Sequence, residues 1–156
     1  MRNLPPLSIT ASSQRDGFEA HTSIILPQND TLGSPGGWVS SETALSQWIQ
    51  VAFPGLMNIE NIATEGLNQI ESWVKAYRLS HSTNGIDFKT ISDENGFEID
   101  FVGNKDSLTF SVNELSFNAT HVRLLPQSWN NRIALRWELF GCPVGENFHS
   151  LPTTLP

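Results

Sequence analysis

The chain is poor in cysteine, in positive charge and in long apolar runs, and each shortage excludes a class of protein. Cys142 is the only cysteine in 156 residues, so no intramolecular disulfide can form. Nine Lys and Arg residues face sixteen Asp and Glu residues, and the net charge of −7 without a basic cluster argues against nucleic acid as a partner. No apolar run approaches the roughly 20 residues that span a bilayer, so we expect a soluble chain without a transmembrane segment.

Catalytic motifs are missing as well. The sequence contains no Gly-x-Ser-x-Gly, no His-Glu-x-x-His and no phosphate-binding loop. The histidines are scattered over loops, a strand and the tail, which gives no support for a zinc site: His21, His81, His121 and His149. We therefore expect a protein that is not an enzyme and that requires no cofactor.

Short strands separated by Gly, Asn, Asp, Ser and Pro dominate the sequence. In residues 133–140 the side chains of Ile133, Leu135, Trp137 and Leu139 alternate with others, which predicts a strand with one face in the core. Asn84-Gly85 predicts a hairpin. The pattern as a whole indicates an all-β sandwich with strands at residues 7–12, 47–53, 58–64, 73–80, 88–92, 108–112, 120–125 and 133–140.

The irregular segment at residues 14–38 is a candidate for function, because loops that long inside a compact domain are usually functional or disordered. Residues 39–46 and 67–72 are two shorter loops of the same kind, and such loops carry function on a rigid framework. Residues 143–156 contain three prolines and little periodicity, so we expect a domain at 1–142 followed by a linker or disordered tail. The sequons at Asn29 and Asn118 favour an extracellular location.

Nine segments, in order, resemble the coagulation factor V/VIII type C domain, also called the discoidin domain. They span almost all of residues 8–142, and although each motif alone is weak, nine in register are specific. The segments are Ile9-Thr-Ala-Ser-Ser13, Gly37-Trp38, Gln47-Trp-Ile-Gln-Val51, Ala63-Thr-Glu-Gly66, Trp73-Val-Lys-Ala-Tyr77, Asn84-Gly85, Asp93-Glu-Asn-Gly96, Phe101-Val-Gly-Asn104 and the closing stretch from Pro126 to Cys142.

The resemblance implies an eight-stranded antiparallel jelly-roll sandwich, similar to galactose-binding domains, whose loops form ligand-binding spikes at one end. Members of that family bind galactose-type sugars, phosphatidylserine membranes, collagen or the C-terminal arginine of peptides, so the fold does not select the ligand. Some sugar-binding members hold calcium. A structural calcium ion near Asp16, Asp30 or Glu42 is therefore conceivable, but the sequence identifies no metal ligands.

The sequence departs from the family at three positions. The family usually forms a disulfide to the position of Cys142, but no earlier cysteine exists here, which leaves a free thiol or a bond to another chain. Ala52 replaces the usual aspartate, which puts an ion pair with Arg136 in doubt. Leu67 stands where galactose-binding members carry an arginine.

We expect an extracellular adhesion module that binds a carbohydrate on glycoproteins or cell surfaces, within a multidomain protein. Phe18 would stack on a sugar or pack back on the sandwich, and polar loop side chains would read the hydroxyl groups. Most tryptophans are expected in the core, with Trp38 as the best exception. The candidate contacts are Arg15, Asp16, Phe18, His21, Trp38, Glu42, Asn68, Gln69, Ile70 and Glu71.

Two alternatives remain open. Phe18 and Ile70 would be the inserting tips of a module that recognises phosphatidylserine at a membrane surface, although few basic residues surround them. Docking to a protein such as collagen is the other. Ile24 and its neighbours up to residue 26 are expected to pack under the long first loop.

Overall fold

The computed structural model describes residues 2–25 and 36–145, and the account below is confined to them. These residues form nine strands and two short 3-10 helices. In chain order the elements are β1 (Arg2–Asn3), β2 (Ser8–Ala11), η1 (Ala20–Thr22), β3 (Trp38–Val39), β4 (Ile49–Glu65), η2 (Asn68–Ile70), β5 (Trp73–Ser82), β6 (Lys89–Thr90), β7 (Phe101–Val102), β8 (Ser111–Asn130) and β9 (Ala134–Pro143).

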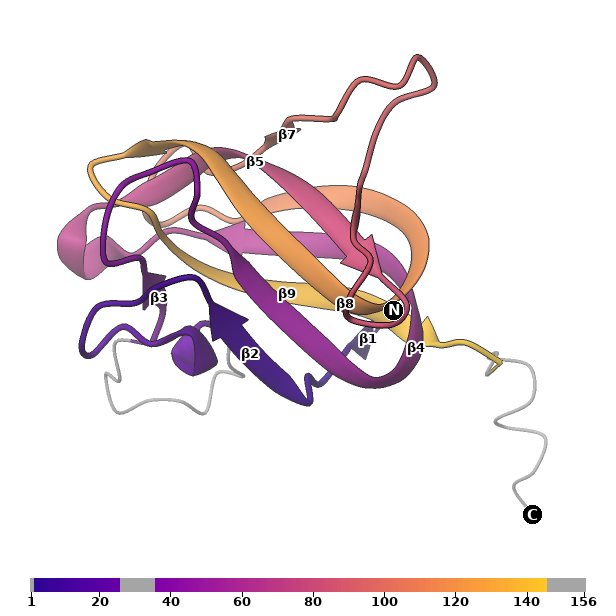
Figure 1. Cartoon of the computed structure of the whole chain (residues 1–156). Helices are drawn as coiled ribbons and strands as arrows, with labels where there is room; N and C mark the ends of the chain where they lie inside the picture. The colour runs from indigo at the N-terminus through magenta and orange to yellow at the C-terminus, as the bar shows by residue number, and fades with distance from the viewer. Residues whose placement is uncertain (1, 26–35, 146–156) are drawn as a thin grey trace.

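Two long strands, β4 and β8, bend so that each takes part in both sheets of the sandwich (Figure 1). The first part of β4 pairs with the second part of β8, from Ile49↔Leu124 to Ala52↔His121. The remainder of β4 pairs with the first part of β8 after a register shift between Ala52 and Met57. Pro54 and Gly55 lie in this shift, where the missing N–H of proline interrupts the ladder and the chain turns back.

The bends produce two facing antiparallel sheets. One contains β2, the first part of β4, the second part of β8, and β5 with β6 and β7 beside it. The other contains the first part of β8, the second part of β4, and β9 with β1 and β3 beside it. The jelly-roll sandwich is thus confirmed. The separately predicted strands at 47–53 and 58–64 are one continuous strand, because strand geometry persists through the Pro-Gly bend.

The core lies between the sheets. Ile133, Leu135, Trp137 and Leu139 are at most 4% exposed, which confirms the predicted inward face of the closing strand. Glu138 is also buried, and its carboxyl group accepts a hydrogen bond from the Asn3 side chain of β1. Trp48, Trp73 and Trp129 are only partly buried, and Trp129 packs against the core from its margin.

The Asn84-Gly85 hairpin is confirmed, and its returning strand is β6 at Lys89–Thr90, which lies within the predicted strand at 88–92 but is shorter. Asn84 Oδ1 accepts hydrogen bonds from the backbone N–H groups of Ile86 (2.8 Å) and Asp87 (2.9 Å). Gly85 has φ of 79°, which a glycine adopts without strain. The side-chain cap therefore builds a wider turn than the two-residue form that Asn-Gly often makes.

Candidate functional site

Three loops and the β8–β9 turn meet at one end of the sandwich, here called the loop end (Figure 1). Residues 12–23 form loop 1, residues 40–48 form loop 2 and residues 66–72 form loop 3. Loop 1 is tied to β3 because Arg15 N donates to Val39 O (2.9 Å) and Val39 N donates to Phe18 O (3.1 Å). Loop 3 closes on itself through two hydrogen bonds between the backbones of Leu67 and Ser72.

The β8–β9 turn supports loop 3 from below. Asn131 Nδ2 donates to Ile70 O (3.2 Å) and to Ser72 Oγ (2.9 Å), and Asn130 Nδ2 donates to Glu71 O (3.3 Å). Glu71 has φ of 45°, so it ends η2 in the left-handed conformation. These contacts fix the backbone of loop 3 and leave its exposed side chains pointing to solvent.

A small apolar cluster lies beneath loops 1 and 3. Val39, Leu67 and Ala134 are buried in it, and the partly buried side chains of Phe18 and Ile70 pack on top. Phe18 and Ile70, which the sequence places 52 positions apart, thus share one platform. Leu67 is 1% exposed, so the position of the family's sugar-binding arginine is here filled by a core side chain.

Trp38 requires a correction. It was expected to be the tryptophan most available to a ligand, but it has no exposed surface. Its Nε1 donates to Ser13 O (2.8 Å), and β3 pairs it with Leu135 of β9. Because a fully enclosed side chain cannot touch a ligand, Trp38 supports loop 1 from the core instead of contributing a contact.

The remaining polar candidates are exposed on loops 1, 2 and 3: Arg15, Asp16, His21, Glu42, Asn68, Gln69 and Glu71. Glu42 Oε1 accepts a long hydrogen bond from Gln47 Nε2 (3.5 Å), and Gln47 also accepts from the hydroxyl groups of Ser12 and Ser13. Loop 2 is therefore joined to loop 1 through a buried glutamine. Ile24 is partly buried and bridges to Trp137, whereas residue 26 and Asp30 lie outside the described residues.

Sequence reasoning missed a fourth loop at this end, residues 103–110, here called loop 4. Ser107 Oγ donates to Asn68 Oδ1 (3.1 Å), which joins loop 4 to η2. Asp106 Oδ1 accepts from the backbone N–H groups of Leu108 (2.9 Å) and Thr109 (2.7 Å), and these hydrogen bonds lower the pKa of that carboxyl group. The run from Leu108 to residue 112 was predicted as a strand, but β8 begins only at Ser111.

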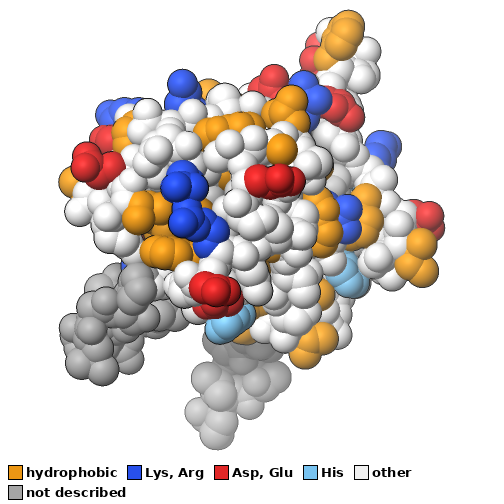
Figure 2. Space-filling view, turned by 60° about the vertical axis from the view of Figure 1, so that its left-hand side comes forward, with side chains coloured by type: hydrophobic (Ala, Val, Ile, Leu, Met, Phe, Trp, Pro, Cys, Tyr) orange, Lys and Arg blue, Asp and Glu red, His pale blue; other side chains and the backbone are white. Residues whose placement is uncertain are grey.

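The exposed apolar tips of the loop end are therefore not the predicted ones. Leu108 is 67% exposed and Phe110 is 52% exposed on loop 4, and Leu45 is 63% exposed on loop 2. Figure 2 brings this side of the molecule forward and shows hydrophobic side chains in small separate groups, with charged and polar side chains between them.

An ion pair involving Arg136 is present despite Ala52. Arg136 Nη1 lies 4.0 Å from Glu65 Oε1, and Arg136 Nε donates to Gly36 O (3.1 Å). Burial raises the pKa of Glu65, and the Arg136 charge acts against that rise. Gln50, two positions before Ala52, accepts two hydrogen bonds from Arg123 at 2.9 and 2.7 Å. Arg136 therefore has an acidic partner on β4 at a position other than that of Ala52.

Metal ligands are not grouped in the described part of the chain, where no three His, Cys, Asp or Glu side chains come together. No helix within the same residues is long and apolar enough to cross a membrane. Cys142 is half-buried near the end of β9 with a free thiol.

The F5/8 type C domain family model matches residues 8–139. The chain belongs to the F5/8 type C domain family. Lactadherin from Rattus norvegicus is 33% identical over 150 residues, a match that covers 89% of this chain and 34% of lactadherin. This chain therefore spans about a third of that relative.

Solved structures agree on the fold of the F5/8 type C domain. Discoidin II of Dictyostelium discoideum superposes with a TM-score of 0.75 at 24% identity, covering 90% of this chain and 57% of that one. A carbohydrate-binding module from Clostridium perfringens, solved in complex with GalNAc-β-1,3-galactose, gives a TM-score of 0.69 at 18% identity and covers 86% and 94%.

Proposed function

We propose that this F5/8 type C domain is an extracellular, non-catalytic recognition module that binds a carbohydrate at its loop end. The observation that carries the proposal is the platform of Phe18 and Ile70, which lies half-buried on Val39, Leu67 and Ala134, with exposed donors and acceptors on the same loops. A sugar ring offers an apolar C–H face and several hydroxyl groups. It therefore suits a flat apolar surface with polar side chains around it.

The polar side chains divide into complementary kinds. Arg15 supplies donors, Asp16, Glu42 and Glu71 supply acceptors, and Asn68 supplies both. Asn68 is held by Ser107 through its Oδ1, so its amide N–H₂ group is oriented as a donor. The likeness to a module solved with a galactose-containing disaccharide supports this proposal. Because Leu67 replaces the arginine of galactose-binding relatives, hydrogen bonding would depend on loops 1 and 3.

A second candidate is insertion into a membrane surface, which the exposure of Leu45, Leu108 and Phe110 favours. Apolar loop tips of this kind enter the headgroup region of a bilayer. The net charge of −7 opposes it on an anionic membrane, where each basic residue contributes about 1 kcal/mol of attraction. In this arrangement the exposed side chains of loop 4 would enter the membrane, in place of Phe18 and Ile70, which the sequence predicts as the inserting tips.

Glycan-array binding and co-sedimentation with phosphatidylserine vesicles separate the two candidates. The Asn68→Ala/Glu71→Ala double variant is expected to lose about tenfold in glycan affinity, because each hydrogen bond contributes about 0.5–1.5 kcal/mol. Leu108→Ser/Phe110→Ser is expected to leave glycan binding intact. Glu60→Ala, a surface change on β4, is the control. Vesicle binding that is abolished by the loop 4 variant, with no glycan signal, would replace the carbohydrate proposal with the membrane one.

The cellular role follows from the same proposal. An extracellular module within a longer protein would attach that protein to glycoproteins or cell surfaces and so mediate adhesion. Asn118 lies exposed on β8, where a glycan would be attached in the secretory pathway.

A further inference from the structure

A groove of about 630 Å³ lies between the edges of the two sheets, away from the loop end. Residues 114–117 of β8 form one wall, and residues 89–94 of β6 and the segment after it form the other. Both walls are runs of consecutive residues. Since neighbouring side chains of a strand point to opposite faces, a consecutive run indicates that each strand presents its backbone edge to the groove.

Hydrogen bonds close the space between the sheets on either side of this groove. Asn113 Nδ2 donates to Val102 O (2.9 Å) and to the hydroxyl oxygen of Tyr77 (2.9 Å). Beyond the groove, Thr120 Oγ1 donates to Ser82 O (3.2 Å), where β8 crosses to pair with β5. Between these closures β8 pairs with β4 along one edge, and within residues 2–25 and 36–145 no strand pairs with its other edge.

The floor of the groove is an uncovered flank of the hydrophobic core. Ile91, Phe101, Leu115 and Phe117 are partly buried, pack against the core and line the groove. The His81 ring stacks on Phe117 with centroids 4.6 Å apart and an interplanar angle of 24°. An apolar side chain placed here would bury surface that the fold leaves half-open.

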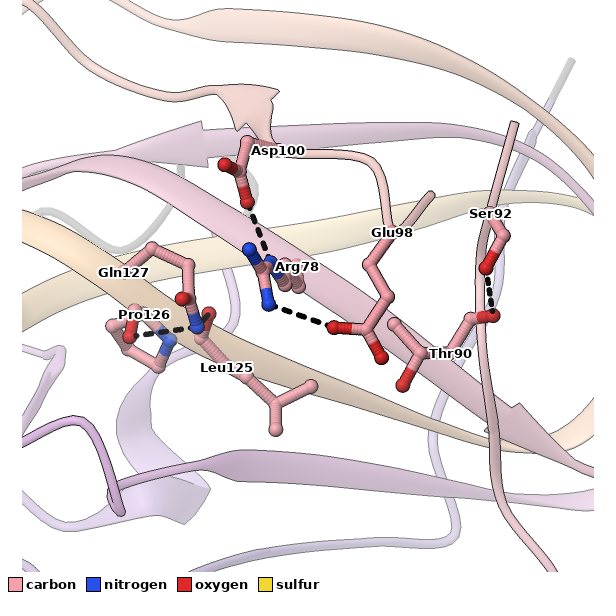
Figure 3. Close-up of polar contacts among 8 residues, drawn as sticks. All are labelled: Arg78, Thr90, Ser92, Glu98, Asp100, Leu125, Pro126 and Gln127. Carbon is pink, nitrogen blue, oxygen red and sulfur yellow. Dashed lines mark hydrogen bonds and ion pairs between the residues drawn. The ribbon is translucent and has the colours of Figure 1, made fainter. Parts of the chain in front are cut away.

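The outer wall is a fixed arm, residues 91–100, which projects from the sandwich (Figure 1). Arg78 on β5 holds the base of the arm by donating from Nη1 to Glu98 (2.7 Å) and from Nε to Asp100 (2.6 Å) (Figure 3). Within the arm Ile99 N donates to Ile91 O (3.0 Å). The groove therefore does not depend on an unsupported loop for its shape.

Among the charged side chains of the groove lining, acidic ones outnumber basic ones. The lining contains the carboxylates of Asp93, Glu94 and Glu114 and one lysine, Lys89. In the described part of the chain none of these carboxylates forms an ion pair, whereas the nearby carboxylates of Glu98 and Asp100 are paired with Arg78. The charge of the groove thus complements a cationic occupant.

We propose that this groove binds an extended segment of another polypeptide in which apolar and basic residues alternate. The segment adds as a strand to the free edge of β8, because an unpaired edge offers N–H and C=O groups to an incoming backbone. Alternate side chains of the segment then lie on the floor at Phe117 and Leu115, and the others meet Glu94 and Glu114. Residues 114–117 accommodate about four residues, roughly 13 Å at about 3.3 Å per residue.

The test uses labelled eight-residue peptides and nuclear magnetic resonance of the whole chain. An alternating valine–lysine peptide is expected to bind, with shift changes at residues 89–94 and 114–117 and none in loop 3. An alternating valine–glutamate peptide is expected not to bind. A third peptide has the valine–lysine sequence but carries an N-methyl group on every second backbone nitrogen, so that one edge of the extended chain lacks N–H donors. It is expected to bind at least tenfold more weakly, because strand addition needs those donors.

Matched charge reversals complete the test. Glu94→Lys/Glu114→Lys is expected to weaken the valine–lysine peptide about tenfold, because rim ion pairs contribute up to about 1 kcal/mol each. Glu19→Lys/Glu60→Lys makes the same change of net charge outside the groove and is expected to have little effect. Equal loss in both double variants, equal binding of the valine–glutamate peptide, or shift changes confined to the loop end would overturn the proposal. Thermal melts establish that each variant is folded.

Discussion

The Leu67 side chain lies directly against Gly37, with no room for a further carbon atom between them. A Cβ built on Gly37 would overlap the Leu67 isobutyl group and would lie 2.9 Å even from its Cδ1 atom. Gly37 also has φ of 131°, a conformation that residues with a side chain rarely adopt. This contact joins the start of β3 to loop 3, so it sets how close the first and third loops come.

We expect Gly37→Ala to lower the free energy of unfolding by about 2–4 kcal/mol, through overlap with Leu67 and backbone strain together. Gly17→Ala is the matched control. Gly17 has φ of 87° but meets nothing within 4 Å, so that variant measures the backbone cost alone. Urea denaturation followed by tryptophan fluorescence gives both values. Equal losses in the two variants would show that the contact with Leu67 contributes nothing.

Trp137→Ala is expected to cost about 3–5 kcal/mol of unfolding free energy, as for other large core truncations. Trp137 is 1% exposed, and its Nε1 donates to Ser23 Oγ (3.1 Å). Phe97→Ala is the control, because Phe97 is 71% exposed at the end of the arm and its truncation should change stability by less than about 0.5 kcal/mol. A cost near zero at Trp137 would contradict its place in the core.

The sequence was sufficient for the sandwich because the fold depends on alternation, which is local. Residues 133–140 show this plainly, since their period fixes which side chains of β9 face inward. The continuity of β4 was not predictable in the same way. Pro54 and Gly55 are turn residues, and whether the ladder resumes after them depends on pairing with β8, far along the chain.

The candidate site was predicted less completely, because it too depends on contacts between segments that are far apart in the sequence. The burial of Trp38 is not visible in the sequence, because β3 has two residues and is too short to show an alternating pattern. β3 is held instead by contacts with β9 and loop 1. Leu108 and Phe110 looked like strand residues because they are apolar and spaced by two. The Asp106 carboxylate accepts hydrogen bonds from the N–H groups of residues 108 and 109, and Asn104 Nδ2 donates to the carbonyl of residue 109, so side-chain contacts hold this segment in loop 4.

Acid is expected to weaken the fold through His81. Burial, with the Lys89 charge, lowers the pKa of His81 below its ordinary value of 6.5. The unfolded chain then binds a proton on this residue at a higher pH than the folded chain. The contribution of His81 to stability is therefore fully present above about pH 6.5. It is lost as the pH falls from there through the lower pKa of the folded chain.

His81→Phe keeps a ring against Phe117 and is expected to remove this part of the acid-induced loss. Urea denaturation of wild type and variant at pH 7 and pH 5 measures the difference. His21→Ala, at an exposed position of loop 1, serves as the control and should lose stability in acid as the wild type does. An unchanged loss in His81→Phe would assign the acid sensitivity to other groups.

Asn118 is expected to carry an N-linked glycan when the chain is secreted from eukaryotic cells. It is exposed on β8 within the sequence Asn118-Ala119-Thr120, and its Oδ1 accepts a hydrogen bond from Asn58 Nδ2 (3.0 Å) that leaves its own amide nitrogen accessible. Mass spectrometry of the secreted chain before and after glycosidase treatment detects the glycan, and Asn118→Gln should remove that mass increment. Asn29→Gln reports separately on the other sequon. A secreted chain whose mass is unaffected by Asn118→Gln would show that Asn118 is not modified, although its side chain is exposed in the fold.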